Sequence, residues 1–242
     1  MSTSRRLSIL YEDDVLIALD KPAGLLIAPD RWDKGLDNLM HRVHTQLSPD
    51  IFNVHRLDKD TSGVVLCAKN RLVLDRLLSQ FSTHQVNKRY LAITLHVPVE
   101  DERTVDLRLA PDPRHVGRVW IHRDGKPAVT HFQTMEKFRG YALVCARPET
   151  GRQHQVRVHL AALHCPVLAD PFYGGGAGLL LSTLKRHYKE PRDGERPLIG
   201  RLALHAESIA FPHPVTGASL TIQAPLPNDF AVALKYLRKF AA

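Results

Sequence analysis

The sequence is poor in cysteine and lacks any long hydrophobic run. Its 242 residues include three cysteines, Cys67, Cys145 and Cys165, with no CxxC pair among them. Such a sparse, odd set predicts reduced thiols rather than a disulfide framework. No eighteen consecutive residues are apolar enough to span a bilayer, and the N-terminus lacks the apolar core of a signal peptide. These absences predict a cytoplasmic, soluble protein with no membrane partner.

Motifs for nucleotide cofactors and metals are also missing. Four glycines lie between residues 174 and 178, but no GK[ST] follows them, and no GxGxxG with an acidic partner opens a helix. The histidine pairs His41–His44 and His154–His159 match neither HExxH nor a Cys/His zinc pattern. We therefore expect no cofactor and no metal.

Positive charge is present in excess. Lysine and arginine number 33 against 25 acidic residues, which gives a net charge of +8 and a pI of about 9.6. This excess favours binding to polyanions, because cations that displace condensed counterions from phosphates drive association. A solvated basic surface would produce the same composition, so charge alone supports a nucleic-acid partner without identifying one.

Segments typical of strands and helices are interspersed without a regular βαβ repeat. Strand-like composition occurs over 15–27, with a turn at Pro22 and Gly24, and over 63–70, 88–97, 141–148, 202–211 and 218–224. Helical spacing of apolar residues occurs over 36–47, 73–81, between Gly151 and Pro166, and around Phe230, Leu234 and Leu237. Hydrophobic residues make up 44% of the chain, enough for a substantial core. The pattern predicts an α+β fold with a mixed, largely antiparallel sheet flanked by helices and loops.

The chain shows no interdomain linker, so we expect one domain over residues 1–242. The stretch 176–198 differs from its surroundings, because it follows a glycine-rich segment and is strongly charged. We interpret it as a mobile insertion that carries a short helix.

The segment VHRLDKDTSG, residues 54–63, concentrates charge just before an apolar run. One interpretation is a solvated turn between strands. Another is chemistry: Asp58 and Asp60 would lie on the same side of a strand, and glycosidases use paired carboxylates. Asp60 precedes Thr-Ser-Gly, a run that suits a turn. We therefore assign Asp60 to a turn, keep Asp58 as the catalytic candidate, and expect Gly63 to permit a close approach of the chain.

A carboxylate in a pocket needs a cation if it is to stay ionised, because desolvation raises its pKa and a nearby guanidinium lowers it. The segment GRQHQVRVH, residues 151–159, offers Arg152 and Arg157. On a helix, His154 and Arg157 share a face, while Arg152 lies in the preceding turn. The alternative is an ordinary polar helix face.

Five motifs occur together in order: HRLDKDTSG (55–63), KRY (88–90), TGRQHQVRVH (150–159), ADPFYGG (169–175) and RLALHA (201–206). With the opening ILYEDDVLIALDKPAGL (9–25), they closely resemble the RluA-type pseudouridine synthases, which isomerise uridine in ribosomal or transfer RNA. The resemblance extends from about residue 9 to 226.

The resemblance implies that Asp58 is the catalytic aspartate. Tyr90 matches the active-site tyrosine that packs on the target base, and Arg157 matches the arginine that pairs with the aspartate. The implied reaction is an intramolecular transfer that follows flipping of the base out of the RNA.

The resemblance also implies a set of substrate-binding residues. Arg56 matches an arginine that enters the RNA and takes the space of the displaced base, and Leu204 matches an apolar residue that lines the pocket. Arg152 and His154, in the histidine-rich motif, are expected to contact the substrate as well. From the residues alone, Leu204 and Tyr90 could equally be ordinary core side chains.

The sequence departs from the family in three places. Some relatives carry an N-terminal RNA-binding domain of the S4 type, whereas catalytic-domain sequence begins here near residue 9, so we expect this domain to find RNA by itself, as a monomer. Ala169 stands where glycine is more frequent, a small-for-small change expected to matter little. The 176–198 stretch has no counterpart in the shortest relatives.

Two other functions remain open at this point. A non-catalytic RNA-binding or ribosome-assembly protein could retain the fold, and would bind RNA without modifying it. A nucleoside hydrolase or glycosidase built on Asp58 and Asp60 would release free base or sugar.

Overall fold

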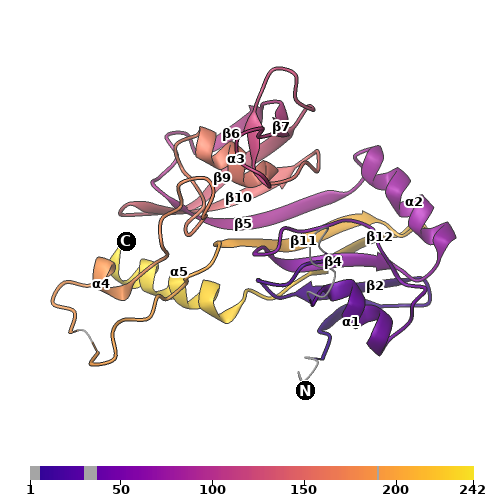
Figure 1. Ribbon diagram of the computed structural model, residues 1–242, viewed down its shortest axis with the longest axis horizontal. Helices are drawn as coiled ribbons and strands as arrows, with labels where there is room; N and C mark the ends of the chain where they lie inside the picture. The colour runs from indigo at the N-terminus through magenta and orange to yellow at the C-terminus, as the bar shows by residue number, and fades with distance from the viewer. Residues whose placement is uncertain (1–5, 30–36, 190) are drawn as a thin grey trace. The chain divides into compact units, whose positions relative to one another are not determined.

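In the computed structural model, residues 6–29, 37–189 and 191–242 are described, and they divide into two compact units (Figure 1). Unit 1 comprises the chain up to Lys88 together with Ala206–Pro225, and unit 2 comprises Arg89–His205 together with Leu226–Ala242. The units are described separately below. The single domain expected over residues 1–242 stays a prediction.

Unit 1 is built on an antiparallel sheet. Its strands are β1 (Ile9–Glu12), β2 (Leu16–Lys21), β3 (Phe52–Asn53), β4 (Ser62–Ala68), β12 (Ser219–Gln223) and, from Ala206 onward, β11 (Leu204–Pro212). The β2 strand pairs with β1 and β4, β3 pairs with β4, and β12 pairs with β11, all antiparallel. The strands expected within 15–27, 63–70, 202–211 and 218–224 are therefore confirmed, and β1 and β3 are additional.

The β4 strand lies at the centre of this unit, and all seven of its residues are buried. Gly63, its second residue, has a φ of +116°. A β-carbon at Gly63 would lie 2.1 Å from the carbonyl oxygen of Ala206, far inside van der Waals contact. The expected close approach at Gly63 is therefore confirmed, and the neighbour is the main chain of β11.

Two amphipathic helices, α1 (Leu39–Gln46) and α2 (Arg71–Ser82), belong to unit 1. Each begins after an asparagine whose side chain accepts a hydrogen bond from a main-chain N–H of the first turn, Asn38 from His41 and Asn70 from Val73. The buried residues are Leu39, Met40 and Val43 on α1, and Val73, Leu74 and Leu77 on α2. Both expected helices are confirmed, although Leu36 lies outside the described residues, and Leu47 and Leu78, expected on the apolar faces, are exposed.

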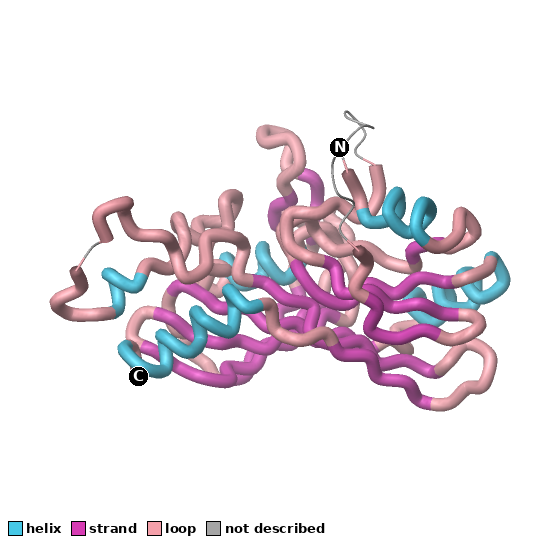
Figure 2. Tube along the Cα trace, turned by 90° about the horizontal axis from the view of Figure 1, so that it is seen from below, coloured by secondary structure: helices cyan, strands magenta, loops and turns pink. Residues whose placement is uncertain are grey.

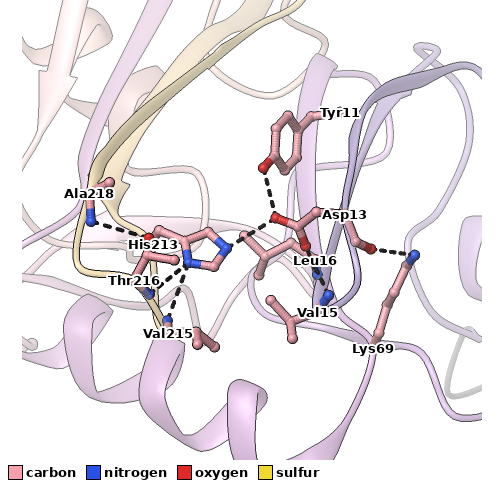
Figure 3. Close-up of polar contacts among 9 residues, drawn as sticks. All are labelled: Tyr11, Asp13, Val15, Leu16, Lys69, His213, Val215, Thr216 and Ala218. Carbon is pink, nitrogen blue, oxygen red and sulfur yellow. Dashed lines mark hydrogen bonds and ion pairs between the residues drawn. The ribbon is translucent and has the colours of Figure 1, made fainter.

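The turn after β1 and the turn after β11 are joined by a polar cluster around Asp13 (Figure 3). The Asp13 carboxylate accepts hydrogen bonds from the Tyr11 hydroxyl at 2.7 Å and from the main-chain N–H groups of Val15 and Leu16. His213 Nε2 lies 3.0 Å from Asp13 Oδ2, and its Nδ1 accepts from the N–H groups of Val215 and Thr216. These acceptor contacts place the ring proton on Nε2, so His213 donates to Asp13. Burial by itself raises the pKa of Asp13, but the hydrogen bonds that its carboxylate accepts outweigh this effect and lower the pKa below its ordinary value.

Unit 2 contains four further antiparallel strands, in which β10 pairs with β5 and β9, and β9 pairs with β6. These strands are β5 (Asn87–Leu95), β6 (Glu102–Asp106), β9 (Val129–Phe138) and β10 (Tyr141–Pro148). A separate hairpin pairs β7 (Leu109–Pro111) with β8 (Val119–Ile121). The expected strands over 88–97 and 141–148 are confirmed, whereas β6 to β9 were not predicted.

Three helices complete unit 2: α3 (Gln155–Ala162), α4 (Leu181–Leu184) and α5 (Asn228–Phe240). The expected buried face of α5, Phe230, Leu234 and Leu237, is confirmed and joins one core cluster with strands β5 and β10 and with α3. Figure 2 shows α5 running along this unit to the C-terminus. Its last turn is fixed by an ion pair between Arg238 and Glu136 and by the Arg139 N–H, which donates to the Ala241 carbonyl.

The 176–198 stretch carries the short helix expected for it, α4. Its base is closed by main-chain hydrogen bonds between Leu179 and the Leu198–Ile199 segment. Leu184 of α4 is buried in the core cluster of unit 2. The stretch is therefore anchored at its base and at α4, and its mobility stays a prediction.

The expected α+β class with a largely antiparallel sheet is confirmed, since every strand pairing given above is antiparallel. Within the described ranges, no helix has both the length and the apolarity that crossing a bilayer requires.

The contact at Gly63 generates a stability prediction. Gly63→Ala should destabilise the protein by more than about 3 kcal/mol, because backbone strain at positive φ adds to an overlap with main-chain atoms that cannot rotate away. Gly217→Ala is the matched control, since Gly217 has a φ of +72° but open space around its Cα, and it should cost about 1 kcal/mol. Urea unfolding of both variants measures the difference, and equal losses would contradict the packing argument.

Candidate active site

Asp58 lies in the loop between β3 and β4 of unit 1. The Asp58 residue is partly buried and Arg56 is exposed. Lys59 and Asp60 form a turn, and the Thr61 N–H donates to the Asp58 carbonyl at 3.2 Å. The turn role of Asp60 is confirmed. The expectation that Asp58 and Asp60 share one side of a strand is wrong, because the strand begins only at Ser62.

A buried lysine holds this loop from one side. Lys21 is completely buried, and its ammonium donates to the carbonyls of Pro22 at 2.9 Å, Leu25 at 2.7 Å and Lys59 at 2.8 Å. The Gly24 N–H donates to the same Lys59 carbonyl at 2.9 Å. Two donors therefore fix the main chain one residue after Asp58. The turn at Pro22 and Gly24 was predicted from the sequence, whereas no role was predicted for Lys21.

A histidine holds the other side of the loop. His55 Nε2 accepts a hydrogen bond from the Leu66 N–H of β4 at 3.0 Å, and its ring stacks on Phe81 of α2 with centroids 5.3 Å apart. Burial, with the nearby positive charge of Lys88, lowers the pKa of His55 to about 4. Its neutral form is the one that can accept from Leu66, so the anchor requires an uncharged ring.

In unit 2, Arg157 of α3 forms a buried ion pair with Asp170. Arg157 Nε lies 2.7 Å from Asp170 Oδ2 and Nη2 lies 2.8 Å from Oδ1, which is a bidentate geometry. The side chains are 5% and 0% exposed. Asp170 Oδ1 also accepts from the N–H groups of Phe172 and Tyr173. One carboxylate therefore fixes both the plane of the guanidinium and the start of the next loop.

Two aromatic rings frame this ion pair. The Arg157 Cζ lies 5.3 Å from the ring centroid of Phe172 and 5.2 Å from that of Tyr173. His154 Nδ1 lies 2.8 Å from the Tyr173 hydroxyl. His154 precedes α3 as its N-cap, with a φ of +54°, so it does not share a helical face with Arg157 as expected. Tyr173 nevertheless contacts both side chains.

The ADPFYGG loop is tightly closed. The Ala169 N–H donates to the Gly175 carbonyl at 2.6 Å, and a β-carbon on Gly175 would lie 2.0 Å from the Val167 carbonyl oxygen. Ala169 has a φ of +58°, in the left-handed region, which costs an alanine about 1–2 kcal/mol. The replacement of glycine by Ala169 therefore carries a cost in backbone strain that similarity in size did not suggest.

The remaining predicted site residues also lie in unit 2. Tyr90 of β5 is half-buried, pairs with Ala146 of β10, and packs against the core cluster that contains Leu204. Leu204 itself is buried. Arg152 is exposed, precedes α3, and donates from Nε to the Pro127 carbonyl at 3.0 Å.

Asp58 and Arg56 thus share one loop of unit 1, whereas the other five predicted residues belong to unit 2. The pairing of Asp58 with Arg157 stays a prediction. The geometry also depends on four residues that were not predicted from the sequence: Lys21, Asp170, Phe172 and Tyr173. The ADPFYGG motif was the signal that could have found the last three.

A family model described as RNA pseudouridylate synthase matches residues 15–162 of this chain, more than half of its length. The chain belongs to the RNA pseudouridylate synthase family. The Asp58 loop, Tyr90 and Arg157 all fall inside the matched region. The protein is therefore an RNA pseudouridine synthase, an isomerase.

Relatives of this pseudouridine synthase cover nearly the whole chain. Ribosomal large subunit pseudouridine synthase D of Xanthomonas campestris is 38% identical over 98% of this chain and 71% of its own length. Uncharacterized RNA pseudouridine synthase YlyB of Bacillus subtilis is 35% identical over 96% of this chain and 73% of its own length. The solved structure of human RNA Pseudouridylate Synthase Domain Containing 4 has a TM-score of 0.72 and 27% identity, and covers 96% of this chain and 93% of that one.

The His55 anchor makes the stability of this pseudouridine synthase depend on pH. The folded-state pKa of about 4 lies below the ordinary 6.5, so between pH 4 and 6.5 the unfolded chain binds more protons and stability falls as the pH falls. The free energy of unfolding should therefore fall by about 2 kcal/mol between pH 7 and pH 5 because of His55. Urea unfolding at both pH values should show a smaller drop in His55→Gln. An equal drop in variant and wild type would contradict the role of His55.

The Arg157–Asp170 pair generates a second prediction for the synthase. Asp170→Asn should lower the free energy of unfolding by about 3 kcal/mol, because it removes one charge of a buried, bidentate ion pair. Asp229→Asn is the matched control, since Asp229 forms the same bidentate pair with Arg201 at 2.7 and 2.8 Å but is 38% exposed. This control should cost about 1 kcal/mol or less. Urea unfolding compares the two, and equal losses would show that burial of the pair is unimportant.

Proposed function

We propose that this synthase isomerises a uridine of large-subunit ribosomal RNA, with Asp58 as its catalytic group. The observation that carries the assignment of Asp58 is its position on a loop fixed at both ends, by Lys21 through the Lys59 carbonyl and by His55 through β4. The choice of RNA is supported by relatives named ribosomal large subunit pseudouridine synthase D and by the net charge of +8.

The reaction is a rearrangement within one nucleotide. The bond between uracil N1 and ribose C1′ breaks, the uracil rotates, and a bond forms between C5 and C1′. The hydrogen on C5 then leaves as a proton, and N1 gains one. No electrons are gained or lost, and no water is consumed. The chemistry therefore requires a carboxylate, a pocket that holds the detached base, and control of protons.

The target base must leave the RNA stack before Asp58 can reach its sugar. Flipping a nucleotide costs a few kcal/mol, and less where the base is already unpaired. Stacking of the uracil on Tyr90 would offset part of this cost, since base–aromatic stacking contributes about 1–3 kcal/mol. Arg56 is exposed, as required of a side chain that enters the RNA and fills the vacated space.

Arg157 would keep Asp58 ionised during the reaction. A guanidinium close to a carboxylate favours its charged form, which is needed whether Asp58 attacks the sugar or promotes loss of the base by removing a proton. Asp170 holds Arg157 in one plane through two hydrogen bonds. The guanidinium would therefore meet its second carboxylate already oriented, at no further cost in side-chain entropy.

The remaining predicted residues complete the pocket. Leu204 would provide an apolar wall, and Arg152 and His154 would contact the nucleotide near the start of α3. We further propose that the enzyme works as a monomer in the cytoplasm. The buried state of all three free cysteines fits that compartment.

Tritium release from RNA labelled at uridine C5 tests the function and the role of Asp58 together. Asp58→Asn should abolish release from total RNA of cells that lack the enzyme while leaving RNA binding nearly intact, because the amide cannot act as a base or nucleophile. Asp60→Asn is the matched control, as the neighbouring carboxylate in the turn, and should retain activity.

Three other outcomes are informative. Normal release by Asp58→Asn would refute the catalytic assignment. Binding by the wild type without release from any RNA pool would favour a non-catalytic RNA-binding protein, and free uracil would indicate a hydrolase. Release from transfer RNA alone would overturn the choice of ribosomal RNA.

A further inference from the structure

The hairpin of β7 and β8 carries a high density of positive charge. Residues 107–127, here called the basic arm, contain five lysines and arginines and two aspartates, a net charge of +3 in 21 residues. In Figure 1 the loop beside the β7 label extends away from the sheet of unit 2. The cations of the basic arm are Arg108, Arg114, Arg118, Arg123 and Lys126.

Two of these cations are not neutralised by the fold. Arg114 and Lys126 are exposed, and in the described part of the chain neither side chain forms an ion pair. Of the two aspartates, Asp112 is bonded to His115 and to the Arg114 main-chain N–H rather than to its side chain. Positive charge therefore faces solvent on this hairpin.

The basic arm also presents an aromatic surface. The rings of Trp120 and His122 are stacked, with centroids 5.0 Å apart and planes 16° from parallel. Trp120 is half-buried, while Ile121, the next residue, and Val116, in the turn before β8, are 40% and 94% exposed. Cations interleaved with stacked aromatic rings are the combination that proteins use to bind RNA, through phosphates and bases respectively.

The basic arm is ordered by its own main chain. Leu109 and Lys126 exchange N–H···O hydrogen bonds of 2.9 and 2.8 Å, and the Asp112 N–H donates to the Arg118 carbonyl at 3.0 Å. A β-carbon on Gly125 would lie 2.6 Å from the carbonyl carbon of Leu109, which shows how closely the two sides approach. Its exposed cations are therefore held on a fixed framework.

The basic arm is attached to the Arg157 cluster through residues 117–119, where its turn leads into β8. The Val119 N–H donates to the Tyr173 hydroxyl at 2.9 Å, the same hydroxyl that contacts His154. Arg118 Cζ lies 5.1 Å from the centroid of Phe172, and Gln153 Nε2 donates to the Gly117 carbonyl. Phe172 and Tyr173 are the rings that frame Arg157. An RNA held by the arm would therefore be held by the same rigid assembly that orients Arg157.

We propose that the basic arm binds the sugar–phosphate backbone of the substrate RNA outside the target nucleotide, with Arg114 and Lys126 as phosphate contacts and Trp120 as an adjoining stacking surface. This inference rests on the proposed function. RNA is favoured over an acidic protein because the same hairpin carries exposed cations, which suit phosphates, and a stacked pair of rings, which suits bases.

The first experiment uses tryptophan fluorescence. The chain has two tryptophans, Trp32 and Trp120, so Trp32→Phe leaves Trp120 as the single reporter on the basic arm. Titration with a ribosomal RNA fragment should change this fluorescence with the same midpoint as a filter-binding measurement on the same RNA. Binding with no change at Trp120 would overturn the inference.

The second experiment compares two double variants that remove the same charge. Arg114→Ala/Lys126→Ala should raise the Kd for RNA about tenfold and reduce the slope of log K against log salt by about 1.5, since each phosphate contact contributes about 0.7–0.9. Lys235→Ala/Lys239→Ala, on the exposed face of α5, should leave the slope unchanged. Arg114→Gln/Lys126→Gln repeats the test with side chains of similar length, and thermal unfolding confirms that each variant is folded.

The outcomes separate this inference from the proposed function. Equal losses in both double variants would mean a general charge effect and would overturn the role of the basic arm. If the wild type releases tritium but its RNA binding does not depend on Arg114 and Lys126, the role of the basic arm is refuted and the isomerase function stands. Dependence of binding on the arm, with no release by the wild type from any RNA, would refute the isomerase function and leave the arm as an RNA-binding surface.

Discussion

The buried ion pair between Arg157 and Asp170 is the interaction on which the functional part of unit 2 depends. Asp170 bonds the guanidinium through two oxygens and also accepts the N–H groups that begin the following loop. A buried charge is stable only when it is paired and its remaining hydrogen-bonding capacity is used. The segment 170–173 meets both requirements. It therefore fixes the position of Arg157 together with the closed ADPFYGG loop and its two aromatic rings.

Unit 1 uses a buried cation in the same way. The ammonium of Lys21 bonds three main-chain carbonyls, one of which belongs to the residue after Asp58. In unit 1 the buried cation therefore fixes the loop that carries Asp58. In unit 2 the buried cation, Arg157, is itself a proposed site residue and is held by the carboxylate that orders the ADPFYGG loop.

Much of this fold could be predicted from local patterns. The asparagine caps and apolar spacing of α1 and α2, the continuous apolar run of β4 and the buried face of α5 are each encoded within a short window of sequence. The strands β6 to β9 were missed because their patterns are weak. The β6 strand has one buried residue in five, and β9 buries Thr130 in place of an apolar side chain.

The site was predictable only in part, for a different reason. Motif resemblance selected Asp58, Tyr90 and Arg157 as candidates, but it did not reveal what holds them. Lys21 acts on a carbonyl 38 residues away, and Asp170 reaches an arginine 13 residues earlier in the chain. Such contacts leave no periodic signal, because a buried polar residue satisfies its hydrogen bonds through the tertiary fold rather than through its sequence neighbours.

The two anchors of the Asp58 loop, Lys21 and His55, form their hydrogen bonds in opposite charge states. Lys21 donates three hydrogen bonds in its charged form, so added protons do not weaken it. His55 accepts from Leu66 only when neutral, and its pKa near 4 records the cost of charging it in place. Of these two anchors, acid therefore weakens only His55: the hydrogen bond from the Leu66 N–H is lost, while Lys21 stays bonded to the Lys59 carbonyl. The segment around Asp58 should then lose its register with the sheet before it loses its turn, because the turn is held by a group that is already protonated.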